Sequence, residues 1–299
     1  MPLWIPITIA AAFFQNLRSA LQKRLKGRMG TTGATFVRFG FGLPFAVLYL
    51  VMVAAIGGET IPVPTVTLIL CALAGGLAQI GGTFLLVYLF GLRNFIVGTA
   101  YSKTEPVQAA LFGFLILGET VSPFGLVAVV AGVVGVLLIS VGNARSGSLL
   151  GGLSSREAVI GVASGALFGI SAVFFRAAAL ALPEGSVPLR AALTLAVALT
   201  IQTLAMLAWM ALRDRGELRR VAKAWAPGLL VGFVGASASA GWFTAMTLQK
   251  VAYVRALGQI ELVFTVASSI FWFRETVTRL ELAGAAVIVL AILTLVVGA

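Results

Sequence analysis

Long apolar segments recur along almost the whole chain and constrain its fold more than any other feature. A helix needs roughly 20 apolar residues to cross the hydrocarbon core of a membrane, and ten segments reach this length between Gly, Pro or charged residues. The expected spans are residues 3–22, 33–56, 64–91, 95–117, 123–142, 157–180, 188–212, 226–248, 251–273 and 280–298. The sequence therefore predicts an all-α integral membrane protein with ten transmembrane helices.

The composition argues against soluble, metal-binding and nucleic-acid-binding proteins. Of the 299 residues, 60% are hydrophobic and 10% are charged, which is more apolar surface than a water-soluble domain of this size can cover. The chain has no His and a single Cys, Cys71, so neither an internal disulfide nor a zinc or iron–sulfur site is expected. We expect no cofactor, no metal and no nucleic-acid partner.

The distribution of basic residues predicts the orientation in the membrane. With ten spans, the odd-numbered loops share one face, and most of the 21 Lys and Arg residues lie in them, whereas the other face has only Lys250. Loops rich in Lys and Arg stay in the cytoplasm. The odd-numbered loops are therefore expected to be cytoplasmic and both termini external, in a multi-pass protein of the bacterial inner membrane.

The sequence contains an internal repeat with an offset of 156 residues. Glu105 then aligns with Glu261, and Glu119 aligns with Glu275. Because each copy has five expected spans, the second copy must enter the membrane from the opposite side. We expect a first five-helix repeat at residues 1–145 and an inverted second repeat at residues 157–299, around a central cavity. Such repeats are typical of transporters that work by alternating access.

Three short motifs resemble those of one known family: Glu105-Pro106, Gly118-Glu119 after eleven intervening residues, and Phe168-Gly169. They are similar to signatures of the EamA family in the drug/metabolite transporter superfamily, whose ten-helix, two-repeat plan covers the whole chain. Within the family, the sequence most resembles amino-acid exporters of the YddG type. The second copy departs from the motif at Leu262 and Arg274, and the family more often places its termini in the cytoplasm.

Span four carries the clearest candidates for substrate binding. Lys103 and Glu105 lie near its middle, where ionisable groups are costly and usually functional. Tyr101, Glu105 and Gln108 would share one helical face, and Pro106 would kink the helix there. Glu105 is expected to bind a cationic amine or a coupled proton, and Lys103 a carboxylate. The alternative is a buried ion pair that only fixes helix packing.

The repeat relates this part of span four to Gln259 and Glu261 in span nine. Glu261 has a second interpretation, a structural pair with Arg255, Arg176 or Arg18. At the span junctions, glutamates 119 and 275 are expected to complement helix dipoles or to form a gate with basic residues.

Aromatic and polar residues in other spans complete the expected site. Trp242 follows the run of small residues at 235–241, which leaves room for its ring in a cavity, although an interfacial tryptophan is the alternative. Amide and hydroxyl groups in apolar helices either line a cavity or bond a neighbouring helix. The expected substrate-binding residues are Phe14, Asn16, Gln79, Tyr101, Lys103, Glu105, Phe168, Ser171, Trp242, Gln259 and Glu261.

These features together predict a secondary transporter that exports small metabolites, amino acids first among them. Its partners would be a small-molecule substrate, the lipid bilayer and, as a candidate coupling ion, the proton, and we expect a monomer. The alternatives are a membrane channel or a non-transporting scaffold. A lipid-modifying enzyme is less favoured, because its chemistry needs clustered Asp or a His–Asp pair and the only Asp is Asp214.

Overall fold

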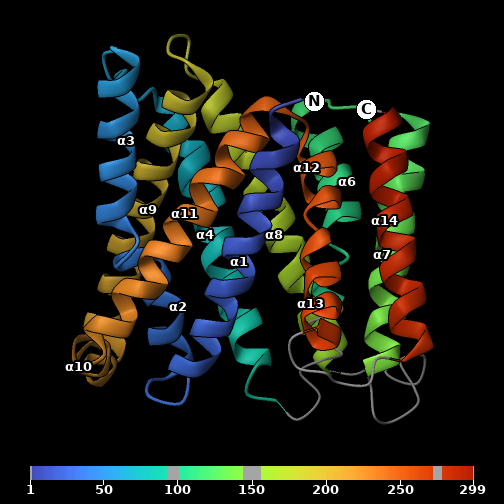
Figure 1. The fold of residues 1–299 in the computed structure, drawn as a ribbon. Helices are drawn as coiled ribbons and strands as arrows, with labels where there is room; N and C mark the ends of the chain where they lie inside the picture. Colours follow the sequence, from blue (N-terminus) through green and yellow to red (C-terminus); the bar gives the residue numbers. More distant parts are fainter. Residues whose placement is uncertain (1, 93–100, 144–155, 272–277, 299) are drawn as a thin grey trace.

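The computed structural model describes residues 2–92, 101–143, 156–271 and 278–298, and all regular structure in these ranges is α-helical. Figure 1 shows one bundle with both termini at the same end and α10 at the other. The helices are α1 (Trp4–Leu25), α2 (Thr31–Gly40), α3 (Leu43–Gly57), α4 (Val66–Leu89), α6 (Glu105–Leu117), α7 (Pro123–Asn143), α8 (Arg156–Leu180), α9 (Val187–Arg213), α10 (Arg215–Lys223), α11 (Trp225–Leu248), α12 (Val251–Leu257), α13 (Ile260–Phe271) and α14 (Arg279–Gly298).

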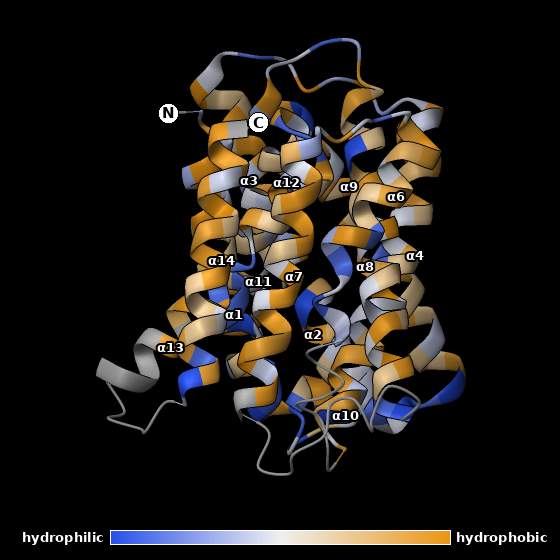
Figure 2. Cartoon of the chain, turned by 90° about the vertical axis from the view of Figure 1, so that its right-hand side faces the viewer, coloured by the Kyte–Doolittle hydropathy of each residue, from blue (hydrophilic) through white to orange (hydrophobic). Residues whose placement is uncertain are grey.

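The helices confirm an all-helical membrane protein but not the count of ten spans. Among the described residues, seven segments are long and apolar enough to cross a membrane: Thr31–Gly57, Val66–Leu89, Pro123–Val141, Arg156–Leu180, Val187–Arg213, Trp225–Leu248 and Arg279–Val297. The polar residues Gln15, Asn16 and Arg18 interrupt the apolar character of α1. Helix α6 has 13 residues. Figure 2 shows hydrophobic residues along most helices and hydrophilic residues at the end of the bundle that carries α10.

The prediction of a continuous helix over residues 251–273 is wrong, because α12 ends at Leu257 and α13 begins at Ile260. Span four has its break at the equivalent place, residues 103–104, directly before α6. Pro106 in the first turn of α6 accounts for the first break, since proline has no N–H for the Ser102 carbonyl four residues earlier and its ring clashes with that carbonyl. The second break has no proline, but Gly258 there packs so closely on Trp242 that a Cβ atom would lie 2.5 Å from the indole ring.

Two further features of the structure depart from the predicted spans. The expected helix over residues 33–56 is divided into α2 and α3 at Phe41 and Gly42, with Pro44 in the first turn of α3. The short helix α10 was not predicted, because its nine residues are mostly charged. It is nevertheless attached to the bundle, since the Glu217 Oε1 atom accepts a 3.0 Å hydrogen bond from the backbone nitrogen of Gly33.

The largest helix contacts join the first half of the chain to the second half, in the pairs α7 with α14, α4 with α8, and α1 with α11. Small residues bring the backbones close, as is typical within membranes. In the α4–α8 pair, the Ser164 hydroxyl donates a 2.9 Å hydrogen bond to the carbonyl oxygen of Gly82. In the α7–α14 pair, a Cβ atom at Gly284 would lie 2.5 Å from the Gly135 carbonyl oxygen. The halves of the chain therefore form one body.

A larger side chain at Gly284 should destabilise the bundle, because the atom it would meet is backbone and cannot rotate away. We expect Gly284→Val to lower the free energy of unfolding by about 1–3 kcal/mol, the usual cost of overpacking, as measured by unfolding of the purified protein in detergent. Ala286→Val adds similar bulk on the exposed side of the same helix and should change stability little. Equal stability of the two variants would contradict this account of the α7–α14 contact.

Candidate functional site

Two ion pairs lie where the fourth helix of each half is broken. Lys103, just before α6, pairs with Glu261 in the first turn of α13. Arg255 in α12 pairs with Glu105 at the start of α6, with 3.0 Å between the Arg255 Nε and Glu105 Oε1 atoms. Each pair therefore takes one residue from each half of the chain. This exchange makes the two breaks a single charged centre inside an apolar bundle.

Both acidic residues of this centre occupy the first turn of a half-helix. Glu105 is the first residue of α6, and Glu261 is the second residue of α13. The free backbone N–H groups and the dipole at a helix N-terminus stabilise a negative charge. The breaks therefore do more than bend the chain, because they place a partial positive charge beside each carboxylate. Transporters place such discontinuous helices at their substrate sites near the middle of the membrane.

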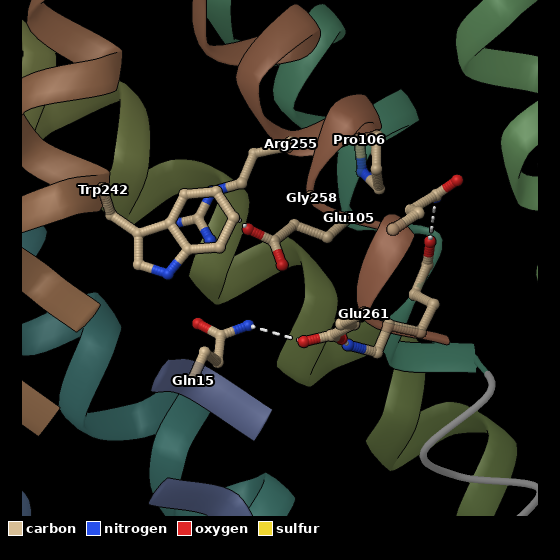
Figure 3. A pocket seen from close by; sticks show the side chains of 9 residues that line it. Gln15, Glu105, Pro106, Trp242, Arg255, Gly258 and Glu261 are labelled. Carbon is tan, nitrogen blue, oxygen red and sulfur yellow. Dashed lines mark hydrogen bonds and ion pairs between the residues drawn. The ribbon is translucent and has the colours of Figure 1, made fainter. Parts of the chain in front are cut away.

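Trp242 covers the Arg255–Glu105 pair on one side. The centroid of its ring lies 4.6 Å from the Arg255 Cζ atom, a cation–π contact. Figure 3 shows Trp242, Arg255 and Glu105 pointing toward one another. The ring is 4% exposed, and its indole nitrogen has no hydrogen-bond partner among the described residues. Trp242 is thus an internal residue next to the charged centre and not an interfacial tryptophan.

Amide side chains complete the site. The Gln15 Nε2 atom in α1 donates a 3.5 Å hydrogen bond to Glu261 Oε2, as Figure 3 shows. The Gln259 Nε2 atom donates to the backbone oxygen of Lys103 at 3.4 Å, whereas its Oε1 atom has no partner in the described parts of the chain. Together these groups surround a small pocket of about 20 Å³, lined by Gln15, Lys103, Glu105, Pro106, Trp242, Arg255, Gly258, Gln259 and Glu261.

Five of the residues predicted from the sequence line this pocket: Lys103, Glu105, Trp242, Gln259 and Glu261. Sequence reasoning missed Arg255 and Gly258 as site residues. Arg255 was considered as a partner of Glu261, but the structure pairs it with Glu105. A glycine directly before a polar residue in an apolar span was the available signal for the second break.

Four predicted residues in the other helices lie outside the pocket. The Gln79 side chain joins α4 to α9, since its Oε1 atom accepts a 2.9 Å hydrogen bond from Gln202 Nε2. Ser171 is fully buried and donates to the backbone oxygen of Phe168 in its own helix at 2.9 Å. Phe168 itself packs beside Gly82. Phe14 packs edge to face on its neighbour in α1. Among the described contacts, Gln79 and Phe168 join neighbouring helices, whereas Ser171 and Phe14 contact residues of their own helices.

Tyr101 and Asn16 also lie outside the pocket lining. Tyr101 is buried but precedes the break at residues 103–104. The prediction that Tyr101 shares a helical face with Glu105 and Gln108 is therefore wrong for Tyr101, because the helix does not continue across the break, whereas Glu105 and Gln108 both lie in α6. Asn16 is half-buried on α1, one residue after Gln15, so the helix turns it away from the position that lines the pocket.

A third ion pair between the halves lies at the end of the bundle that carries the termini. The Arg176 Nε atom of α8 lies 2.5 Å from Glu119 Oε1, which follows α6. Arg176 also donates a 3.0 Å hydrogen bond to the backbone oxygen of Gln249, and Lys250 Nζ donates to the backbone oxygen of Thr120 at 2.7 Å. The predicted pairing of Glu119 with a basic residue is present, whereas residue 275 lies outside the described residues.

No metal site accompanies these charges in the described part of the chain, where no group of three or more Cys, Asp or Glu side chains could hold an ion. The buried carboxylates instead face cationic side chains. A charged organic solute can therefore take the place of one partner in either ion pair.

Comparison with known proteins identifies the family. A comparison with curated protein sequences finds no match. Among solved structures, 27 chains match, and a crystal structure of one protein covers 99% of this chain and 96% of its own chain with a TM-score of 0.74 at 16% sequence identity. That likeness shows a shared fold. The family model of EamA-like transporters matches residues 2–141 and again residues 157–297. The chain therefore belongs to the EamA-like transporter family, with two EamA units, and its members are transporters rather than enzymes.

Proposed function

We propose that this secondary transporter exports small amphipathic metabolites from the bacterial cytoplasm by alternating access, with amino acids as the first candidates. The exchanged ion pairs, Lys103 with Glu261 and Arg255 with Glu105, carry the proposal. Each pair supplies one cation and one carboxylate, which are the groups that a zwitterionic solute carries. Such a solute competes for both partners of a pair, and the Trp242 ring beside them offers an apolar surface for its side chain.

The direction of the helices supports inverted repeats of five spans each, at residues 1–145 and 157–299. In Figure 1, α1 runs away from the end that carries the termini, and α8, its counterpart in the second half, runs toward that end. Counting α1, α6 and the pair α12 with α13 as spans, in addition to the seven apolar segments, gives ten. Two units in opposite orientation have two equivalent arrangements, which is the basis of alternating access.

The ion pairs explain how binding and motion are coupled. Buried charges separated from their partners are costly, so the empty protein holds its halves together through Lys103–Glu261 and Arg255–Glu105. A solute that replaces one partner of each pair removes this link without leaving a charge unpaired. The halves are then free to rock against each other. Glu105 is also the candidate proton carrier, and facilitated diffusion without protons is the simpler alternative.

The Arg176–Glu119 pair is the candidate external gate. It joins the connection after α6 to α8, and Arg176 also bonds the backbone where α11 ends. With the termini outside, this end faces the exterior, and the pair must separate before solute leaves. The resemblance to YddG-type exporters favours the same direction of transport.

Two substitutions in the pocket should reduce transport while the protein remains folded. Glu105→Gln removes a charge that the solute needs, and Arg255 keeps its contact with the Trp242 ring. Trp242→Ala removes the apolar wall. We expect each variant to lower counterflow of a labelled amino acid in liposomes by about tenfold or more, which corresponds to roughly 1.4 kcal/mol of lost interaction.

The matched control is Glu281→Gln, which neutralises a carboxylate at the start of α14 and should leave counterflow unchanged. Gel filtration and membrane levels check folding of all three variants. Normal counterflow by both pocket variants would show that Glu105 and Trp242 are not site residues. Ion conductance of the unchanged protein in liposomes, in place of saturable counterflow, would favour a channel.

Cysteine labelling tests the proposed orientation. After replacement of Cys71, a cysteine at Arg28, an exposed residue between α1 and α2, should react with a membrane-impermeant maleimide only in permeabilised cells. A cysteine at the exposed Glu184, between α8 and α9, should react in intact cells. The reverse pattern would place both termini in the cytoplasm and invert the direction of the proposed gate.

A further inference from the structure

Two arginines beside the pocket are buried and form no ion pair with a carboxylate of the described residues. Arg18 in α1 is 3% exposed and Arg38 in α2 is 4% exposed. The Arg38 Nη1 atom donates a 3.0 Å hydrogen bond to Thr83 Oγ1, and Arg18 reaches the Ser19 hydroxyl at 3.5 Å from Nη2. Within the described ranges, Arg18 Nε and Nη1 and Arg38 Nε have no hydrogen-bond partner. Each guanidinium thus keeps unused donors in the interior.

The two guanidinium groups belong to one cluster. A Cβ atom at Gly235 of α11 would lie 3.4 Å from Arg18 Cδ and 3.5 Å from Arg38 Cγ, so both stems pack on the same glycine. Like charges this close repel, and each buried ion pays for its lost hydration. Buried hydrogen-bond donors are usually paired, so unpaired donors indicate that a ligand provides the missing acceptors. A negative charge would satisfy both arginines at once.

The charge balance around the pocket leads to the same conclusion. Two acids, Glu105 and Glu261, already face two cations, Lys103 and Arg255. Adding Arg18 and Arg38 gives four cations against two acids, an excess of two positive charges. Arg18 also interacts repulsively with Arg255 and Lys103, and Glu105, the acid that attracts Arg38, is already paired with Arg255. In the same helix, Gln15 lines the pocket one turn before Arg18, so the cluster is continuous with the pocket.

We propose that Arg18 and Arg38 bind an oxyanion of the transported solute, a carboxylate or a phosphate, and that among small amphipathic metabolites those with a net negative charge are preferred. The inference rests on the proposed transport function and names its substrate class. The guanidinium fork suits this role, because it binds the two oxygens of a carboxylate or phosphate side by side. The residues of the two ion pairs, Lys103–Glu261 and Arg255–Glu105, then contact the remaining polar groups of the solute.

Four probes that share a phenyl ring separate the charge classes: 3-phenylpropionate, phenyl phosphate, L-phenylalanine and 2-phenylethylamine. Titration calorimetry of the purified protein in detergent should give binding of at least one of the two anions about tenfold or more tighter than that of L-phenylalanine, because the excess positive charge repels the ammonium group. 2-Phenylethylamine should bind weakest. The better of the two anions shows whether the cluster is a carboxylate or a phosphate site. Tighter binding of the zwitterion or the amine, or no binding of either anion, would overturn the proposal.

Variants assign the binding to the cluster. Arg18→Gln and Arg38→Gln should each weaken anion binding by about tenfold or more, since a charge-assisted contact is lost, and they should leave 2-phenylethylamine binding unchanged or stronger. Arg18→Lys and Arg38→Lys keep the charge and serve if the Gln variants do not fold; they should retain part of the affinity. Arg213→Gln removes an exposed cation at the end of α9 and should have no effect. Equal losses in all variants would show a nonspecific charge effect and contradict the site.

Counterflow in liposomes separates this inference from the proposed function. Arginine-dependent anion binding without counterflow of any probe would retain the anion site and reject transport of these solutes. Counterflow of L-phenylalanine that 3-phenylpropionate and phenyl phosphate do not inhibit, and that Arg18→Gln and Arg38→Gln do not change, would retain the transporter and reject the anion site.

Discussion

The ion pairs exchanged between the two breaks are the constraint on which the rest of the structure depends. A charge within an apolar bundle is tolerated only with a partner, and here each half of the chain supplies the partner for the other, Lys103 for Glu261 and Arg255 for Glu105. This requirement fixes how α6 and α13 face each other and keeps the pocket at the junction. The same groups are then available to a charged solute, so stability and function share one set of residues.

Much of the fold follows from hydrophobic length and the internal repeat. The apolar segments define the long helices to within a few residues, and the offset of 156 residues identifies the equivalence of Glu105 and Glu261. The break at Pro106 was readable as a kink, because proline has a known local effect. The break at Gly258 was not readable, since glycine occurs inside helices as well as at their ends, and only the structure shows the Trp242 ring in the space of a side chain there.

The site was only partly predictable, because polar residues in apolar helices have two uses. Gln79 and Glu261 look alike in the sequence, yet Gln79 bonds Gln202 in a neighbouring helix whereas Glu261 lines the pocket. The role of Arg18 and Arg38 depends on which helices pack against them, and no sequence pattern specifies that α1, α2 and α11 meet at Gly235. The excess of buried cations over acids around the pocket, which only the structure shows, identifies these residues. The positions of the basic residues along the sequence predict only the orientation of the chain in the membrane.

A double-mutant cycle on Lys103 and Glu261 tests most directly whether the exchanged pairs hold the halves together. Lys103→Met and Glu261→Gln should each lower the free energy of unfolding in detergent by up to about 3–5 kcal/mol, because each leaves a buried charge unpaired. The double variant should lose clearly less than the sum, which gives a coupling energy of at least about 1 kcal/mol. Additive losses would mean that the two charges do not support each other, and would contradict the link between the halves from which the transport mechanism is derived.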